Sequence, residues 1–436
     1  MSLDFAWVQS ADSVYAEIMD RLNVVFGHLS SSVTTHDVAA SASPSDDIVV
    51  VQALRTPIGK AKRGSFKDTY ADTLLSHVFK AVIKDVGVNP ADIGDICVGT
   101  VLEPGCNTAR FAQFYSGIPE TVPCTSTNRQ CSSGLQAFMN VAGSIRNGQC
   151  DVGLAAGVES MTKNEMLRKG MDLNPHVFED EKAAQCLIPM GITSENVAER
   201  FGVSREKQDR FSLRSHQNAH KAAVSGLYDA ELVPVTTKIV DKDGNERTIT
   251  VTKDDGIRPS TTMEGLGRLR PAFKEGGSTT AGNSSQVSDG AAAVLLARRS
   301  EAERRRWPIL GVLKSYAVEG CPPDIMGIGP SVAIPSALKK AGLTVSDIDI
   351  FEINEAFASQ AVYCMEKLGI PLEKVNPKGG AVALGHPLGC TGARQIGTLL
   401  HELKRRGKPA YGVVSCAFYV VNVSGPMVWC LVHSTW

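Results

Sequence analysis

The same sequence pattern occurs twice in this chain. Residues 131–148 (CSSGLQAFMNVAGSIRNG) and 390–407 (CTGARQIGTLLHELKRRG) each place a cysteine and a glycine before an apolar run of helical spacing that ends at glycine. A strand-like segment follows each run, at 150–157 and at 411–416. A repeat of this length restricts the fold to architectures that use one supersecondary unit twice.

A second pair of segments supports the duplication. Residues 84–96 and 339–350 both begin with Lys-x-x-Gly and both contain Asp-Ile twice. The repeat therefore predicts an α/β fold with two halves, each a β-α-β-type unit with helices on the faces of a sheet. The equivalent helix starts, near Cys131 and near His386–Cys390, are then expected to face a shared cleft.

The composition excludes several classes of protein. Hydrophobic residues make up 43% and charged residues 21% of the 436 residues, which is ordinary for a globular protein with ample core. Lys+Arg (45) nearly equals Asp+Glu (46), so no basic field favours nucleic acid. The 11 cysteines include no CxxC pair, which argues against a zinc site or a disulfide framework. No apolar run reaches the length of a membrane span.

The first 45 residues differ from the rest. Residues 30–45 are rich in Ser, Thr and Ala and read as a linker. Residues 21–29, RLNVVFGHL, resemble the N-terminal peroxisomal import nonapeptide: Arg-Leu, five residues, His-Leu. The alternative is a short helix that docks on the body. The resemblance predicts a peroxisomal matrix protein that meets an import receptor.

The body divides by sequence character. A long polar section with a probable helical hairpin at 194–223 separates the two repeat-bearing regions. The predicted organisation is a targeting segment and linker (1–45), a first half (46–161), an inserted segment (162–275), a completion of the first half (276–305) and a second half (306–436).

Cys131 is the first candidate for chemistry. It lies between polar residues directly before small residues and an apolar helical run, so it should sit at a helix N-terminus. Exposed backbone N–H groups and the helix dipole there favour the thiolate, which is the nucleophilic form. The alternative is a buried cysteine that only packs.

Asn354 and His386 are the other candidates. Asn354 follows an apolar strand and precedes a helix, a place where asparagine often serves as the N-cap. His386 lies in a loop with five glycines, in residues 378–392, before a helix start that should keep its imidazole neutral. A cysteine opposite a histidine suggests acyl transfer through a thioester, and a peptidase or a transferase would both fit.

Several long motifs, in order, resemble those of the thiolases. They are NRQCSSGLQA, PMGITSENVAERFG, GIRPSTTMEGL, TTAGNSSQVSDGAA, MGIGP, FEINEAFASQ and GGAVALGHPLGCTGAR, and the resemblance spans about residues 46–415. It implies a five-layered αβαβα fold with two duplicated halves and an inserted loop domain that covers coenzyme A. It also implies thiolytic cleavage of a 3-ketoacyl-CoA, coenzyme A as co-substrate, no metal or tightly held cofactor, and a homodimer or a dimer of dimers.

The resemblance assigns roles to individual residues. Cys131 would take the acyl group, and His386 would activate Cys131 and donate to the thioester oxygen. Asn354 would hold a water that completes this oxyanion hole. Four further positions match residues that line the coenzyme A or acyl pocket: Met190, Ser285, Ala356 and Phe357.

The C-terminal tail departs from the family pattern. Thiolases carry a second catalytic cysteine in a Cys-x-Gly-x-Gly loop, but this chain has Cys416 about one residue early and Phe418 at the expected glycine. The final strand that normally follows is not recognisable in the sequence. A side chain cannot reproduce the close backbone approach of glycine. Cys416 is therefore expected to be a poor second acid/base, with weak carbon–carbon cleavage.

Two alternatives to a degradative thiolase remain. A condensing enzyme of the ketoacyl-synthase kind would carry a second active-site histidine where this chain has Asn354. A non-catalytic acyl-CoA-binding homologue, disabled by its altered tail, would label at Cys131 without releasing a cleavage product.

Overall fold

The computed structural model describes residues 44–164 and 173–416, and the backbone of 425–434. The chain separates into two units, Met1–Ser45 and Asp46–Trp436. The predicted import nonapeptide at 21–29 lies outside the described residues. The second unit carries the fold.

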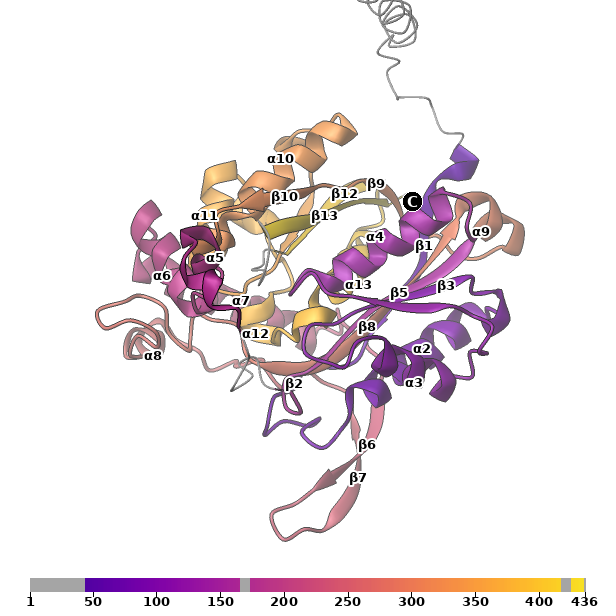
Figure 1. The fold of residues 1–436 in the computed structure, drawn as a ribbon, viewed down its shortest axis with the longest axis horizontal. Helices are drawn as coiled ribbons and strands as arrows, with labels where there is room; N and C mark the ends of the chain where they lie inside the picture. The colour runs from indigo at the N-terminus through magenta and orange to yellow at the C-terminus, as the bar shows by residue number, and fades with distance from the viewer. Residues whose placement is uncertain (1–43, 165–172, 417–424, 435–436) are drawn as a thin grey trace, which may run out of the picture. The chain divides into compact units, whose positions relative to one another are not determined.

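One mixed sheet forms the frame of the second unit (Figure 1). Its strands run in the spatial order β11-β12-β13-β9-β1-β8-β5-β3-β4, with β10 beside β13 and β2 beside β8. Their bounds are β1 (Ile48–Arg55), β2 (Gly59–Lys60), β3 (Asp95–Gly99), β4 (Cys124–Thr127), β5 (Val152–Ser160), β8 (Ser288–Arg298), β9 (Gly311–Ser315), β10 (Val318–Cys321), β11 (Ile350–Ile353), β12 (Ala410–Cys416) and β13 (Gly425–Ser434).

The sheet contains the predicted duplication. In the first half, β3 and β5 are parallel, β8 pairs antiparallel with β5, and β1 pairs antiparallel with β8. In the second half, β11 and β12 are parallel, β13 pairs antiparallel with β12, and β9 pairs antiparallel with β13. The halves join where β1 and β9 pair, at Val49–Val312 and Val50–Gly311. This symmetric order confirms the two-half architecture that the sequence repeat predicts.

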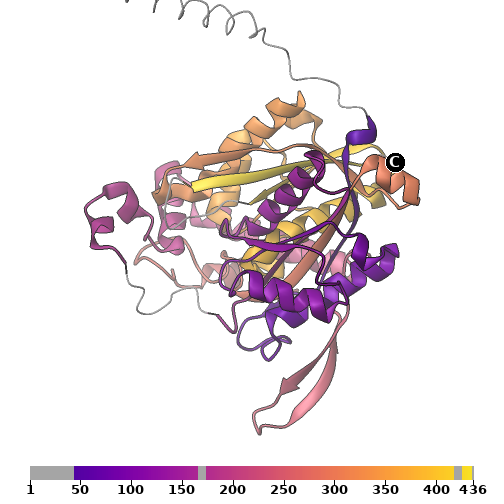
Figure 2. The same cartoon turned by 45° about the vertical axis from the view of Figure 1, so that its right-hand side comes forward.

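Helices form three layers around the two half-sheets (Figures 1 and 2). The helices α2 (Ala71–Val86) and α3 (Cys106–Tyr115) cover the outer face of the first half-sheet. The helices α10 (Pro330–Ala341) and α11 (Ala358–Leu368) cover the outer face of the second. Between the half-sheets lie α4 (Ser133–Arg146) and α13 (Thr391–Arg406), whose apolar side chains share one core with both.

The two central helices are the repeat helices of the sequence. Each follows its cysteine and ends at a glycine in the left-handed region, Gly148 and Gly407, which relieves the strain that a Cβ would cause there. They approach so closely that a Cβ on Gly134 would lie 2.7 Å from the Gly389 oxygen. Small residues at the helix starts therefore bring the two halves into backbone contact.

The inserted segment contains the predicted helical hairpin and, beyond it, a β-hairpin. The helix α6 (Met190–Phe201) ends at Gly202, and α7 (Arg205–Val224) begins after Ser204, whose side chain accepts from the Lys207 N–H. The strands β6 (Val235–Val240) and β7 (Glu246–Val251) form a hairpin that projects from the body in both views (Figures 1 and 2). The short helices α5 (Glu181–Gln185), α8 (Met263–Gly267) and α9 (Arg299–Arg305) complete this region and its return to the core.

The final strand, which is not recognisable in the sequence, is present as β13. The backbone of β13 pairs with β12 along Ala410–Cys416 and with β9, so it lies inside the second half-sheet rather than at an edge. Backbone hydrogen bonds on both sides fix this strand, although its sequence does not match the family pattern. Among the described residues, no helix combines the length and apolar character needed to cross a bilayer.

Candidate active site

Cys131 lies at the start of the central helix α4, as the sequence predicts. It precedes Ser132, the N-cap residue, and is 1% exposed. The preceding residue, Gln130, has φ 48°, in the left-handed region that non-glycine residues seldom adopt. The chain therefore turns sharply into the helix at Cys131, and the cysteine is enclosed between the two halves.

The expected thiolate character of Cys131 was wrong for the resting site. Burial, followed by the nearby Cys416 and Glu159, raises the pKa of the Cys131 thiol well above its usual value. Desolvation of a negative charge outweighs the favourable field of the helix end. Cys131 is consequently a thiol at neutral pH, and a base must take its proton when it reacts.

His386 is held in an orientation that suits such a base. Its backbone N–H donates to the Gln286 oxygen, and its Nδ1 lies 2.6 Å from Thr391 Oγ1. The Thr391 hydroxyl donates to the Pro387 oxygen, so it accepts from Nδ1–H. This arrangement leaves Nε2 as the acceptor nitrogen, 3.4 Å from Asn354 Nδ2.

The His386 ring is neutral, as expected, but for a different reason. Burial, followed by the positive charge of Arg394, lowers the pKa of His386 to about 3. The sequence alone points to the helix N-terminus as the cause. A neutral imidazole with Nε2 as the acceptor nitrogen can remove a thiol proton, and the imidazolium can return it.

Asn354 is not the N-cap of a helix. It follows β11, its backbone N–H donates to the Ser415 oxygen, and α11 begins at Ala358 with Phe357 as the cap. Its side chain is buried beside His386, and its Oδ1 has no hydrogen-bond partner among the described residues. A buried acceptor in this state favours a bound water or a substrate group.

Cys416 ends β12 directly against the Cys131 turn. Its sulfur lies 3.1 Å from the Cys131 oxygen, and its own oxygen accepts from Ser132 Oγ at 2.9 Å. Burial raises the pKa of Cys416 to about 12, opposed by hydrogen bonds from the side chains of Ser132 and Asn354. The structure thus brings Cys131, His386, Asn354 and Cys416 together, whereas Phe418 lies outside the described residues.

Three of the four expected pocket residues lie in one place. The Ser285 N–H donates to the Ala356 oxygen at 2.9 Å, and the adjacent Ser284 bridges to Phe357. Met190 begins α6 and, like Phe357, contacts the central core. The ring of Phe273 packs edge-on against that of Phe357, with 6.1 Å between the ring centroids. Phe273 is not among the residues that the sequence predicts.

Sequence analysis also missed three residues that act on the candidate catalytic groups. Thr391 orients His386, Arg394 lowers the pKa of His386, and Glu159 raises the pKa of Cys131. The one available signal was Glu159, an acidic residue near the end of the otherwise apolar VGLAAGVES strand. The described residues contain no group of three or more His, Cys, Asp and Glu arranged to hold a metal ion.

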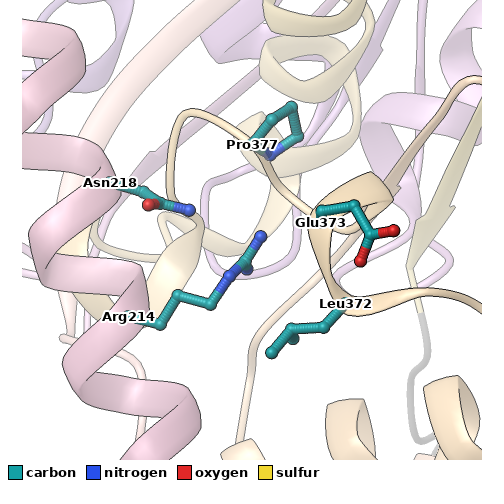
Figure 3. A pocket seen from close by; sticks show the side chains of 5 residues that line it. All are labelled: Arg214, Asn218, Leu372, Glu373 and Pro377. Atoms are coloured by element: carbon teal, nitrogen blue, oxygen red, sulfur yellow. The ribbon is translucent and has the colours of Figure 1, made fainter.

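A surface hollow elsewhere contains none of the predicted site residues. Arg214 and Asn218 on α7 face Leu372, Glu373 and Pro377 across it (Figure 3). The Arg214 guanidinium donates a hydrogen bond to the Val375 oxygen at 2.9 Å and so binds the loop that lines the hollow. The predicted catalytic residues lie instead at the buried junction of the two halves.

Two family models match most of the chain. One, described as "Thiolase, N-terminal domain", matches residues 48–300, and one described as "Thiolase, C-terminal domain" matches residues 307–420. The chain belongs to the thiolase family. The boundary between the two models falls between the two halves of this thiolase. Neither model marks where the inserted segment begins or ends, so its bounds, 162–275, stay a prediction.

Curated relatives match this thiolase over nearly its whole length. It is 66% identical over 407 residues to "3-ketoacyl-CoA thiolase B, peroxisomal" of Rattus norvegicus, covering 91% of this chain and 96% of the relative. It is 64% identical over 407 residues to "3-ketoacyl-CoA thiolase, peroxisomal" of Homo sapiens, with the same coverage.

Solved structures confirm the fold class. The thiolase superposes on the dimeric peroxisomal thiolase of Saccharomyces cerevisiae with a TM-score of 0.83 and 47% identity, covering 90% of this chain and 98% of that chain. A second structure of the yeast enzyme, described as five-layered A-B-A-B-A with two core domains of identical topology, gives 0.73 at 42% identity, covering 91% and 100%. Human mitochondrial 3-ketoacyl-CoA thiolase in complex with CoA gives 0.78 at 35% identity, covering 90% and 99%.

Proposed function

We propose that this thiolase cleaves a 3-ketoacyl-CoA with coenzyme A, giving acetyl-CoA and a shortened acyl-CoA, through an acyl group on Cys131. The observation that carries the proposal is the buried set formed by Cys131, Cys416, Asn354 and His386, linked by close polar contacts. The printed names of relatives at 64–66% identity agree with this reaction, which ends a round of fatty-acid β-oxidation.

In the first step, the Cys131 thiol gives its proton to His386 Nε2, and its sulfur attacks the 3-keto carbon. The bond between C2 and C3 then breaks, and the electron pair stays on C2 of the departing acetyl-CoA. Cys416, against the Cys131 turn, is positioned to donate the proton that C2 needs. The acyl group remains on Cys131 as a thioester.

In the second step, the thiol of coenzyme A attacks this thioester and releases the shortened acyl-CoA. The proton of that thiol passes to the Cys416 thiolate that the first step leaves, and protonated His386 returns its proton to the Cys131 sulfur, so both cysteines are thiols again. Asn354 and a water that its amide holds, with protonated His386, stabilise the negative charge that develops on the thioester oxygen. Met190, Ser285, Ala356 and Phe357 line the substrate side.

The assembly and location follow from the relatives. The yeast structure is described as dimeric, a human mitochondrial relative binds CoA, and the rat and human relatives are named peroxisomal. We infer that this thiolase is a homodimer of the peroxisomal matrix that uses coenzyme A as co-substrate. The expectation that it holds no tightly bound cofactor stays a prediction. The nonapeptide at 21–29 is the segment that an import receptor would read.

The comparisons give no support to the alternative of a disabled acyl-CoA-binding homologue. Cys416 reaches the Cys131 turn in spite of the altered tail. The narrower expectation of slow carbon–carbon cleavage, based on Phe418, stays a prediction.

Single-turnover assays test these roles. Cys131→Ala should show neither an acyl adduct nor thiolysis of acetoacetyl-CoA. Cys416→Ser should still form the Cys131 adduct from a simple acyl-CoA, seen by mass spectrometry, but should lose thiolysis roughly 100-fold or more.

Cys364→Ser, at a buried cysteine on α11, serves as the matched control and should retain both activities. An acyl adduct on Cys131→Ala would refute the proposed nucleophile. Thiolysis by the native chain at ordinary thiolase rates would refute the expectation of a weak Cys416.

A further inference from the structure

We propose that Glu159 is a positioning residue that clamps the His386 loop of the second half onto the Cys131-bearing first half. This inference rests on the proposed function, because it concerns how the two halves of one catalytic site are kept in register. Glu159 lies near the end of β5 and is 0% exposed.

The hydrogen bonds of Glu159 reach both halves. Its Oε1 accepts from Thr100 Oγ1 at 3.1 Å and from the Leu102 N–H at 2.9 Å. Its Oε2 accepts from the Val101 N–H at 3.0 Å and from the Gly389 N–H at 2.9 Å. Oε2 is thus shared between the first half and the loop of the second half.

The hydrogen bond to Gly389 also fixes the position of His386, because both residues lie in the same loop. A Cβ placed on Gly157 would lie 2.0 Å from the Gly389 oxygen, so the loop sits directly on the backbone of β5. Gly389 lies between His386 and Thr391, whose hydroxyl orients the imidazole. A shift of this turn would therefore move the base relative to Cys131, and a displacement of about 1 Å can cost roughly 100-fold in rate.

The carboxylate has a second effect of opposite sense. Burial raises the pKa of Glu159 itself to about 7, so its carboxylate is charged above that pH. After burial and Cys416, this negative charge helps to raise the pKa of the Cys131 thiol. Removing the charge should make Cys131 easier to ionise while making catalysis slower. A residue that only stabilised the fold would not produce these two opposite changes.

Glu159→Gln tests the clamp, because an amide keeps the shape but cannot accept hydrogen bonds at both ends. Each oxygen of the Glu159 carboxylate accepts from two donors, so in the variant two of these four donors would face the NH₂ group of the amide and lose their acceptor. We expect kcat for thiolysis to fall roughly 10- to 100-fold with little change in KM. The pH at which iodoacetamide labels Cys131, followed by mass spectrometry, should move downward.

Glu103→Gln is the matched control. Glu103 is another carboxylate nearby, partly buried, and it accepts from the Ser160 N–H and from Asn164 Nδ2 rather than from the His386 loop. It should leave kcat and the labelling curve close to native. Thr100→Val, which removes one donor to Glu159 but keeps the charge and the Gly389 contact, should lower kcat about two- to tenfold and covers the case of an unstable Glu159→Gln.

Native kcat in both Glu159→Gln and Thr100→Val would overturn the proposal. An unshifted or upward-shifted labelling curve in Glu159→Gln would overturn it as well. The labelling readout does not need turnover, so failure of the proposed function would show as an inactive native chain whose labelling still responds to Glu159.

Discussion

At the scale of single residues, the site depends on groups that face each other from distant parts of the chain. Cys131 is buried as a thiol, so its reactivity depends on a base that is neutral and correctly turned. Thr391 fixes that orientation through His386 Nδ1, five residues away in sequence. The nucleophile and the orientation of its base thus come from opposite halves.

Thr391→Val should slow catalysis without unfolding the protein. Valine keeps the volume but cannot accept from Nδ1–H, so the His386 tautomer with Nε2 as the acceptor nitrogen loses its support. We expect kcat to fall roughly 10- to 100-fold with KM little changed, measured by steady-state thiolysis. Ser212→Ala, which removes a buried hydroxyl bonded to the Gln208 oxygen, is the control. Native kcat in Thr391→Val would contradict the assigned orientation.

The sequence identifies the candidate catalytic residues but not their electrostatic state. Cys131 and His386 stand out because helix starts and glycine loops leave local patterns. The high pKa of Cys131 was not predictable, because it depends on burial and on Glu159 and Cys416, which the fold brings near. Glu159 was missed because its decisive partner, Gly389, lies 230 residues along the chain.

At the scale of elements, the contact between α4 and α13 determines how closely the two halves approach. Glycines at the helix starts allow backbone to meet backbone, since Gly392 lies against Leu135 in the same way that Gly134 lies against Gly389. Any side chain added at this crossing would push the Cys131 turn and the His386 loop apart.

Two glycines of α4 make a matched test of this contact. A Cβ on Gly134 would lie 2.7 Å from the Gly389 oxygen and 2.8 Å from the Ala393 nitrogen, whereas a Cβ on Gly143 meets nothing within 4 Å. Gly134→Ala should destabilise the protein by about 1–3 kcal/mol and reduce activity. Gly143→Ala should stabilise it by about 0.5–1 kcal/mol with native activity. Urea unfolding and thiolysis measure both, and equal effects would refute the crossing as the cause.

The elements themselves were largely predictable, with β13 as the exception. The sequence repeat predicts the two half-sheets and their central helices because periodicity and end glycines are local signals. The tail sequence gives no clear strand pattern, and β13 forms where β12 and β9 offer hydrogen bonds on both sides. Its partners, rather than its own residues, determine the strand.

At the scale of the whole molecule, a buried ion cluster joins the first strand, the inserted segment and the catalytic loop. Glu231 accepts from Arg55 at 2.7 Å, from Lys378 at 2.9 Å and from Thr398 at 2.9 Å, and Arg55 also pairs with Asp254. Burial alone would raise the pKa of Glu231, but Lys378 and Arg55 outweigh it and lower this pKa to about 2. Its charge therefore stabilises the fold above pH 4.5 and loses this effect as pH falls toward 2.

Lys378→Met should destabilise the whole molecule by roughly 3–5 kcal/mol, because it leaves Glu231 in a buried site with half of its positive charge removed. The loss should be largest near neutral pH and shrink in acid as Glu231 takes a proton. Lys207→Met, at an exposed ion pair with Glu366, should cost less than about 1 kcal/mol. Urea titrations at pH 7 and pH 4 measure both, and equal losses in the two variants would contradict a structural role for the cluster.

The placement of β8 has a consequence for how the chain is made. This strand separates β5 from β1, yet it follows β5 by 128 residues along the chain. At ordinary synthesis rates, on the order of ten seconds pass between the emergence of β5 and that of β8. Throughout that interval, the edges of β1 and β5 that pair with β8 lack their partner strand. The first half is thus most open to aggregation while its own inserted segment is being translated.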